Sequence, residues 1–313
     1  MLKTQLTASE LPALWITQLS LLCVAAYYYG ARVWIVGAIA ALTCFVLNFF
    51  CVCLRRLPFQ FSNLDAVSTG FTLALMMPAS VPYDILIISC FAAIIIGKQI
   101  FGGRQNLLFP PAAVGYLFAV ASWPEDILRF PELYTRLPLT PSVSVPLKES
   151  LSAAYNTAGV LNTDPDVLWL GLCRGPMGTT AGLLLLVCCI ILLIRRRISR
   201  PAVSGAILML CINYLILPTS TAPIDAMFNG LLTNMSLFCV IYLIGDSRLA
   251  PKGFAGVLFG ALIAAAGIYF TLIAKLEYGF VIAAVLASPI GTALRRDTAR
   301  KESEKESAQA QQA

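Results

Sequence analysis

The chain has 313 residues, of which 58% are hydrophobic and 12% charged, with a formal net charge of +6 and no histidine. Soluble domains are about 45–50% apolar and about 25% charged, so this chain has too little charge to cover a water-facing surface. The composition excludes a soluble enzyme, a disordered chain and a disulfide scaffold, and it predicts an integral membrane protein. Without histidine, any chemistry must come from carboxylates, hydroxyls, thiols or a bound cofactor.

Ten cysteines are present, and most of them lie inside apolar runs, where a thiol behaves as a small buried hydrophobe. The sequence contains a Cys51-x-Cys53 pair but no C-x-x-C pair, so metal or iron–sulfur binding by this chain alone has little support. We interpret the cysteines as packing residues, although one thiol could complete a cluster shared between subunits.

We expect an all-α polytopic membrane protein with about ten transmembrane helices, because ten apolar stretches approach the roughly 20 residues that a helix needs to cross a bilayer. The stretches are residues 11–29, 33–54, 64–81, 83–101, 107–123, 177–194, 201–217, 226–245, 253–274 and 278–294. Glycine or proline interrupts several of them, and such breaks are tolerated where the backbone lines a cavity or packs on protein.

The distribution of basic residues supports this count. With the N-terminus inside, only six lysines and arginines of the 22 face outward, namely Arg32, Arg129, Arg136, Lys148, Arg174 and Lys275. This is the asymmetry of the positive-inside rule, so we expect both termini in the cytoplasm and the chain in a bacterial inner membrane.

Four regions follow from this topology: residues 1–123 as a first membrane half, 124–176 as an outer-face loop, 177–294 as a second half, and 295–313 as a disordered cytoplasmic tail. The outer-face loop is long and proline-rich, which is typical of a functional or a disordered connection, and we favour the functional interpretation.

A short internal similarity links the halves. Asp65-Ala66-Val67-Ser68-Thr69-Gly70 begins the third span, and Asp225-Ala226-Met227-Phe228-Asn229-Gly230 begins the eighth. These spans correspond in a five-plus-five inverted repeat, an arrangement that places a binding site near the midplane.

Two segments are candidates for a cofactor site. Ser68, Thr69 and Gly70 follow Asp65 at a helix start, where free N–H groups can hold an anion or a cofactor edge, although ordinary N-capping by Asp65 explains the pattern equally well. Lys98, Gly102 and Gly103 lie in the run G-K-Q-I-F-G-G-R-Q-N, whose charge could meet a phosphate or a quinone-like acceptor; the alternative is a basic turn that only sets topology.

These motifs resemble the D subunit of the Rnf electron-transport complex, which is related to the B subunit of the sodium-translocating NADH:quinone reductase. The similar segments are Asp65-x-x-Ser68-Thr69-Gly70 with Pro78, the glycine run from Gly97 through Phe109, Pro111-Ala112 and Gly115-Tyr116, then Gly178-Thr179-Thr180, Asp246 with Pro251-Lys252-Gly253, and Glu277-Tyr278-Gly279.

The resemblance implies a membrane subunit of a multi-subunit complex that couples electron transfer to Na⁺ or H⁺ translocation. It also implies FMN, which family members carry on a threonine of an S-G-A-T-like motif in the outer loop. No S-G-A-T occurs in this chain; the loop reads Ser142-Val143-Ser144-Val145-Pro146. We therefore expect any FMN or riboflavin to be non-covalent, with Ser68, Thr69, Gly70, Lys98, Gly102, Gly103, Ser142, Ser144 and Thr180 as candidate cofactor-binding residues.

The sequence identifies no independent catalytic residue and no metal ligand set, and it predicts the bilayer and other subunits, not nucleic acid, as partners. Two alternatives stay open: a small-solute channel or transporter on the same frame, because fold is weak evidence for function, and a scaffold subunit that carries no electrons.

Overall fold

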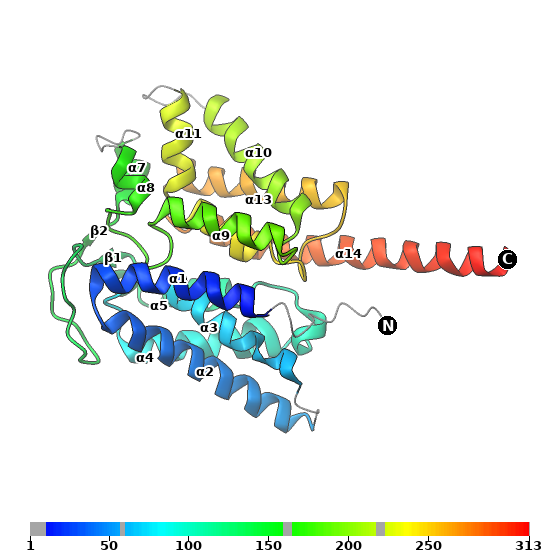
Figure 1. Ribbon diagram of the computed structural model, residues 1–313, viewed down its shortest axis with the longest axis horizontal. Helices are drawn as coiled ribbons and strands as arrows, with labels where there is room; N and C mark the ends of the chain where they lie inside the picture. The colour runs from blue at the N-terminus through cyan, green and yellow to red at the C-terminus, as the bar shows by residue number, and fades with distance from the viewer. Residues whose placement is uncertain (1–10, 57–59, 159–164, 217–222, 313) are drawn as a thin grey trace.

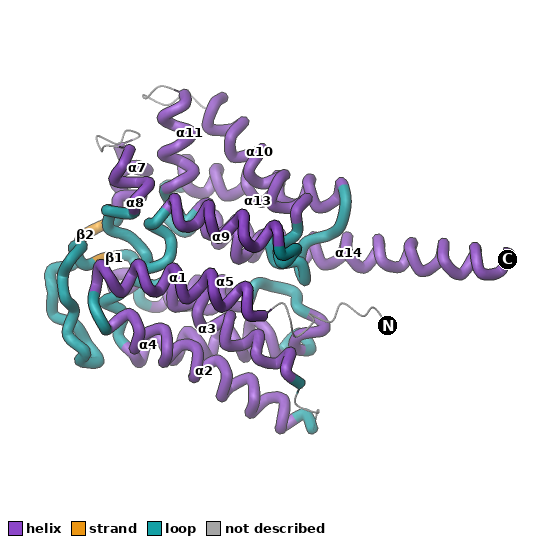
Figure 2. The backbone as a smooth tube through the Cα atoms, in the orientation of Figure 1, coloured by secondary structure: helices purple, strands orange, loops and turns teal. Residues whose placement is uncertain are grey.

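The computed structural model describes residues 11–56, 60–158, 165–216 and 223–312 and is built almost entirely of helices (Figures 1 and 2). In the first half the helices are α1 (Leu11–Tyr29), α2 (Arg32–Leu54), η1 (Phe61–Leu64), α3 (Asp65–Met76), α4 (Tyr83–Phe91), η2 (Ala92–Gln99), η3 (Gly103–Asn106) and α5 (Pro111–Ser122). In the second half they are α9 (Gly182–Ile194), α10 (Arg200–Ile216), α11 (Pro223–Leu232), α12 (Ser236–Cys239), η4 (Val240–Ile244), α13 (Phe254–Ile268), η5 (Tyr269–Ile273) and α14 (Gly279–Gln312).

Between the halves lie residues 124–176, which we call the outer segment after the side predicted for it from the sequence. It is partly ordered into secondary structure, which the sequence did not predict: α6 (Pro124–Ile127), β1 (Arg129–Phe130), β2 (Lys148–Glu149), α7 (Leu151–Ala158) and α8 (Pro165–Leu170). The two strands pair antiparallel, with Arg129 opposite Glu149 and Phe130 opposite Lys148.

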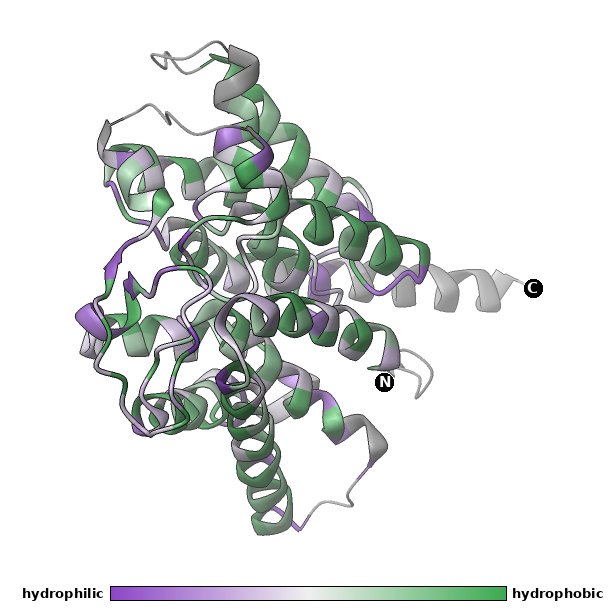
Figure 3. Cartoon of the chain, turned by 60° about the vertical axis from the view of Figure 1, so that its left-hand side comes forward, coloured by the Kyte–Doolittle hydropathy of each residue, from purple (hydrophilic) through white to green (hydrophobic). Residues whose placement is uncertain are grey.

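Four described helical segments are long and apolar enough to cross a bilayer: Leu11–Tyr29, Arg32–Leu54, Phe254–Ile273 and Gly279–Thr298. Three shorter apolar helices are Pro111–Ser122, Gly182–Ile194 and Arg200–Ile216. Hydrophobic residues cover these helices and the polar residues gather in the connections (Figure 3). Large apolar side chains such as Phe50, Leu54 and Ile216 are well exposed, a surface that suits lipid and not water. The chain is therefore an all-helical, multi-pass membrane protein.

The helices form two groups that meet where α1 contacts α9 and where α5 contacts α14 (Figure 1). Within the first group α3 packs closely on α2, because Gly70 has no side chain to keep them apart: a Cβ at this position would lie 2.5 Å from the carbonyl oxygen of Ala40. The buried core runs continuously from Leu22 and Val36 of the first group to Phe238 and Phe280 of the second.

The third predicted span is interrupted at its end. α3 stops at Met76, and the buried Arg32 side chain holds the irregular backbone that follows, donating from Nε to the Ala79 carbonyl at 3.0 Å and from Nη2 to the Val81 carbonyl at 2.9 Å. Arg32 also donates to the carbonyls of Pro138 and Thr140 in the outer segment. Because unpaired carbonyls are costly away from water, this one side chain allows non-helical backbone to be buried here.

The C-terminal region differs from the sequence prediction. α14 continues to Gln312, where we expected a disordered tail after residue 294, and its last part extends away from the bundle (Figure 1). The segment is rich in Ala, Glu, Lys, Arg and Gln, which are strong helix formers, so it can stay helical beyond the apolar stretch.

Candidate functional site

A buried ion pair joins the start of α3 to the end of η2. The Lys98 Nζ lies 2.7 Å from Asp65 Oδ1, and the two side chains are 2% and 4% exposed. Asp65 occupies the first turn of α3 and Lys98 the last turn of η2, so each charge has the sign that the adjacent helix end favours. Burial of two charges is tolerated because each is paired and hydrogen-bonded.

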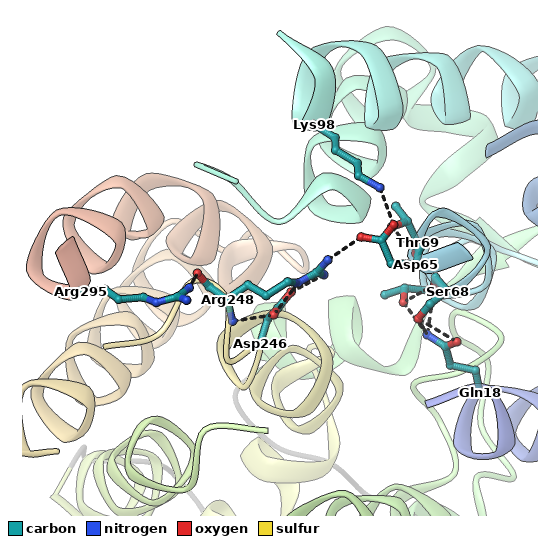
Figure 4. Close-up of polar contacts among 9 residues, drawn as sticks. Gln18, Asp65, Ser68, Thr69, Lys98, Asp246, Arg248 and Arg295 are labelled. Carbon is teal, nitrogen blue, oxygen red and sulfur yellow. Dashed lines mark hydrogen bonds and ion pairs between the residues drawn. The ribbon is translucent and has the colours of Figure 1, made fainter. Parts of the chain in front are cut away.

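The second half of the chain contributes a further cation to the same carboxylate. Arg248, in the connection between η4 and α13, places Nη1 2.8 Å from Asp65 Oδ2 (Figure 4). Asp246 holds this guanidinium, accepting from Nη2 at 2.6 Å and from Nε at 2.9 Å. Arg295 of α14 donates to the Arg248 carbonyl. We call Asp65, Lys98, Asp246 and Arg248 the charge cluster; it connects both halves of the molecule.

The electrostatics keep two members of this cluster, Asp246 and Arg248, ionised. Burial opposes the charge of Asp246, but the charge and hydrogen bonds of Arg248 outweigh it, so the pKa of Asp246 lies below its ordinary value. Burial likewise opposes the charge of Arg248, yet the carboxylates of Asp246 and Asp65 raise its pKa above the ordinary value. Asp246 and Arg248 therefore act as fixed charges near neutral pH.

Next to the charge cluster lie four polar side chains, Gln18, Ser68, Thr69 and Thr72, which we call the polar wall. Gln18, in the middle of α1, donates from Nε2 to Ser68 Oγ at 2.9 Å and to Thr72 Oγ1 at 2.8 Å (Figure 4). The Thr69 hydroxyl bonds back to the Asp65 carbonyl at 3.2 Å. These polar groups satisfy one another and the main chain within apolar helices, which makes the polar wall a candidate functional position.

The polar wall and the charge cluster border a cavity of about 60 Å³. Gln18, Asp65, Ser68, Thr69 and Thr72 line it from the first half, and the second half contributes Arg197, Ile198, Ile241, Tyr242, Leu243, Asp246, Ser247 and Arg248. A water molecule needs at least 10–15 Å³ of such space, so the cavity can hold roughly four waters or a partly hydrated ion.

The structure brings together only some of the predicted cofactor residues. Ser68 and Thr69 line the cavity, Gly70 faces α2, and Lys98 pairs with Asp65. Gly102 and Gly103 form a turn just beyond η2, with φ values of 103° and 77° that favour glycine.

The remaining candidates lie elsewhere. Ser142 and Ser144 are exposed on the outer segment. Thr180 is partly buried in the segment that meets the far end of α3, where Gly178 N donates to the Leu75 carbonyl at 2.8 Å. Thr69 is six residues before Leu75 on α3, a rise of about 9 Å along the helix. The nine residues therefore do not surround one space.

A flavin does not fit the described residues of the cavity. Ligand pockets of drug size occupy about 300–1,000 Å³, well above the cavity next to Ser68 and Thr69. The hydroxyls that would bind it are engaged with Gln18 and with main-chain carbonyls.

Two features of the site were not predicted. Gln18 was not singled out, although a glutamine in the middle of an apolar span is itself a signal of a polar contact. The contact of Arg248 with the first half was not predicted either: Lys252 of the same loop is exposed, but Asp246 and Arg248 are only 16% and 22% exposed, and Arg248 reaches Asp65. For Asp225, at the start of the eighth predicted span, the side chain lies outside the described part of the structure.

Several known proteins are similar in sequence to this chain. The chain is similar to the D subunit of the ion-translocating oxidoreductase complex of Actinobacillus succinogenes, at 36% identity over 115 residues, which are 36% of this chain and 32% of the relative. The corresponding D subunits of Mannheimia succiniciproducens (36% over 100 residues, 31% of this chain and 28% of the relative) and Actinobacillus pleuropneumoniae (32% over 123 residues, 39% and 35%) are also similar.

The chain thus spans about a third of the length of the curated relatives it matches. The family described as NQR2, RnfD, RnfE matches a much longer part, residues 4–302. With a match over nearly its whole length, this multi-pass membrane protein belongs to the NQR2, RnfD, RnfE family.

Proposed function

We propose that the chain is a membrane subunit of an Rnf- or Nqr-like complex that couples electron transfer to the movement of Na⁺ or H⁺. The observation that carries this proposal is the charge cluster, which joins the two halves of the molecule beside a polar cavity. Ionisable groups at membrane depth are costly and typically mark an ion pathway. The names of the relatives support the same role, since each is called a subunit of an ion-translocating oxidoreductase complex.

In this proposal Asp65 is the group on which the coupling depends. Its two oxygens bind one cation from each half, Lys98 and Arg248. A proton or a metal cation that neutralises Asp65 removes the attraction for Arg248, and the contact between the halves weakens. Asp246 keeps Arg248 in place, so the pair can form again when the ion leaves. Electron transfer then only has to change whether a proton or a metal cation is bound at Asp65 in order to open and close the cavity.

The proposal includes the topology of ten spans in two inverted halves, with both termini in the cytoplasm of the inner membrane. The π-helices η2 and η5 support the repeat, because they end the fourth and ninth predicted spans, which correspond to each other. A cysteine introduced at Ser142 is expected to react with a membrane-impermeant thiol reagent in whole cells. If the cysteine at Ser142 does not react, while a cysteine introduced at Lys252 on the predicted inner side is labelled, the proposed orientation is wrong.

Any flavin on this chain is proposed to be non-covalent, since the sequence has no S-G-A-T motif. The denatured band on a gel is expected to show no flavin fluorescence under ultraviolet light, while a relative with the motif serves as the positive control. Fluorescence that persists through acid precipitation would show a covalent flavin and contradict the proposal.

The coupling role is tested in proteoliposomes that contain the complex purified through this chain. Oxidation of the electron donor is expected to drive Na⁺ or H⁺ uptake, and Asp65→Asn is expected to abolish uptake, whereas Lys252→Gln, in the same loop as Arg248, keeps it. Ion or solute flux without a donor would instead identify a channel. Unchanged coupling in Asp65→Asn would leave the chain only a scaffold role.

A further inference from the structure

A second polar site lies at the opposite end of the molecule, where α7 of the outer segment rests on the second half. Asn156 of α7 and Asn234, at the break between α11 and α12, exchange two amide hydrogen bonds of 2.7 and 3.0 Å. The Ser152 hydroxyl accepts from the Asn234 main-chain N–H at 2.9 Å. These contacts attach α7 to the interruption of the eighth predicted span.

At the start of the same helix Ser150 contacts a carboxyl group. Its hydroxyl donates to Glu277 Oε2 at 2.7 Å and accepts from the main-chain N–H of Ala153 at 2.9 Å. Glu277 lies in the connection between η5 and α14 and is partly buried. Ser150 therefore caps α7 and contacts Glu277 at once, and the position of the hydroxyl is fixed from both sides.

The groups that face Glu277 favour its neutral form. Burial is the main reason that its pKa rises to about 7, and the negative charge of Glu149 on β2 adds to the effect, while the hydrogen bond from Ser150 lowers the pKa. From α5, the fully buried Tyr116 interacts electrostatically with Glu277, and its hydroxyl has no hydrogen-bond partner among the described residues. Lys275 and Tyr278 lie on the same connection as Glu277.

The Ser150 hydroxyl connects the Glu277 carboxyl to a basin that is open to solvent. Ser150 lines an open basin of about 470 Å³ whose other walls include the charged residues Arg129, Lys148, Glu149 and Arg174. Of these walls, the Ser150 hydroxyl contacts Glu277 at 2.7 Å, and Lys148 is paired with Glu132 at 2.5 Å.

We propose that Glu277 binds and releases a proton at the outer face, exchanging it with water in the basin through the hydroxyl of Ser150. In the release step the O–H bond of the Glu277 carboxyl breaks and its proton passes to Ser150 Oγ, which gives its own hydrogen to a water molecule in the basin. The carboxylate that remains accepts the hydrogen bond seen in the structure. The inference deepens the proposed function and rests on it for one point only, that the exchanged proton belongs to a translocation pathway.

Infrared titration of the full-length chain in nanodiscs tests the site directly. The wild type is expected to lose one protonated-carboxyl band as the pH rises from about 6 to about 8, centred on the pKa of Glu277. Glu277→Gln lacks this band. Ser150→Ala, which keeps the carboxyl, shifts the midpoint upward because the lost hydrogen bond stabilised the charged form. Glu125→Gln, an exposed carboxyl of the outer segment, leaves the band unchanged.

A wild-type spectrum that matches Glu277→Gln, or a band that disappears below pH 5, would overturn the inference. If Glu277→Gln does not fold, Ser150→Ala decides, since an unshifted midpoint is also incompatible with the proposed exchange. The band can behave as expected while proteoliposomes show no donor-driven uptake; the proton site then stands and the coupling role fails. If donor-driven uptake is observed but the band is absent, the coupling role stands and the proton site fails.

Discussion

The contact between Asp65 and Arg248 gives the sharpest test of how the two halves are held together. The Nη1 and Oδ2 atoms are 2.8 Å apart, and the carboxyl is 4% exposed. At an effective dielectric constant of about 20 the attraction is roughly 6 kcal/mol, most of which offsets the desolvation of the two groups. Removal of one partner from a buried pair costs about 3–5 kcal/mol, because the other charge stays buried.

Arg248→Gln is therefore expected to lower the free energy of unfolding by about 3 kcal/mol, at the lower end of that range because the arginine is 22% exposed. Asp65→Asn is expected to cost a similar amount, since it also leaves Lys98 without its 2.7 Å partner. In the double variant the costs are not additive, and the expected coupling is about 1–3 kcal/mol.

The assay is chemical unfolding of the full-length chain in mixed micelles, for the wild type, both single variants and the double variant. Lys252→Gln removes an exposed cation from the same loop and is expected to change the stability by less than about 0.5 kcal/mol. A coupling below about 0.5 kcal/mol would show that the two residues act independently, and the structural basis for a charge-dependent contact between the halves would be lost.

Three further predictions concern packing, the outer segment and pH. Gly70→Ala is expected to cost about 1–3 kcal/mol of stability, because the new Cβ would lie 2.5 Å from a carbonyl oxygen of α2. The control is Gly37→Ala, whose Cβ would meet only a flexible leucine side chain at 3.2 Å. Thermal unfolding in detergent compares the two variants, and equal losses of stability would contradict the packing of α3 on α2. Arg32→Met is expected to speed proteolysis of residues 138–141, because the Arg32 side chain binds carbonyls of this segment. Arg136→Met, which changes an exposed arginine nearby, is expected to leave the cleavage rate unchanged. Equal cleavage rates in the two variants would show that Arg32 does not anchor the segment. The pKa of Glu277 is raised from 4.5 to about 7, so the folded chain keeps a proton that the unfolded chain loses, and wild-type stability falls as the pH rises from 4.5 to 7. Glu277→Gln is expected to remove this slope, by up to about 1.4 kcal/mol per pH unit, and a slope that persists in the variant would assign it to another group.

Much of the architecture was predictable because the bilayer imposes simple length and composition requirements. The continuous apolar spans of α1, α2 and α13 were located nearly to the residue, since a lipid-facing helix cannot hide a charge or a break. The interrupted spans were harder to predict. α3 ends at Met76, just before Pro78, as this proline predicts. The sequence did not show that Arg32 supplies the donors for the free carbonyls that follow the break.

The cofactor prediction illustrates the same difference. Motif similarity assigned Ser142, Ser144 and Thr180 to one group with Ser68 and Thr69, but motif order carries no information about distance. In the structure Ser68 and Thr69 line the buried cavity, whereas Ser142 and Ser144 are exposed on the outer segment and Thr180 lies near the far end of α3. The charge cluster, by contrast, uses Asp65, Lys98 and Asp246, which the motifs did single out, and only the contact between them was unknown.

By itself, the sequence determined that this is a helical membrane protein, which segments are apolar enough to enter the bilayer, and which family it resembles, because all three depend on composition and local order. The tertiary structure decided which of the few polar groups meet. It paired Asp65 with Arg248, which lie 183 residues apart, and it set Ser150 against Glu277 under α7. In an apolar environment a polar side chain must find a partner wherever the fold provides one, and that partner cannot be inferred from sequence neighbours.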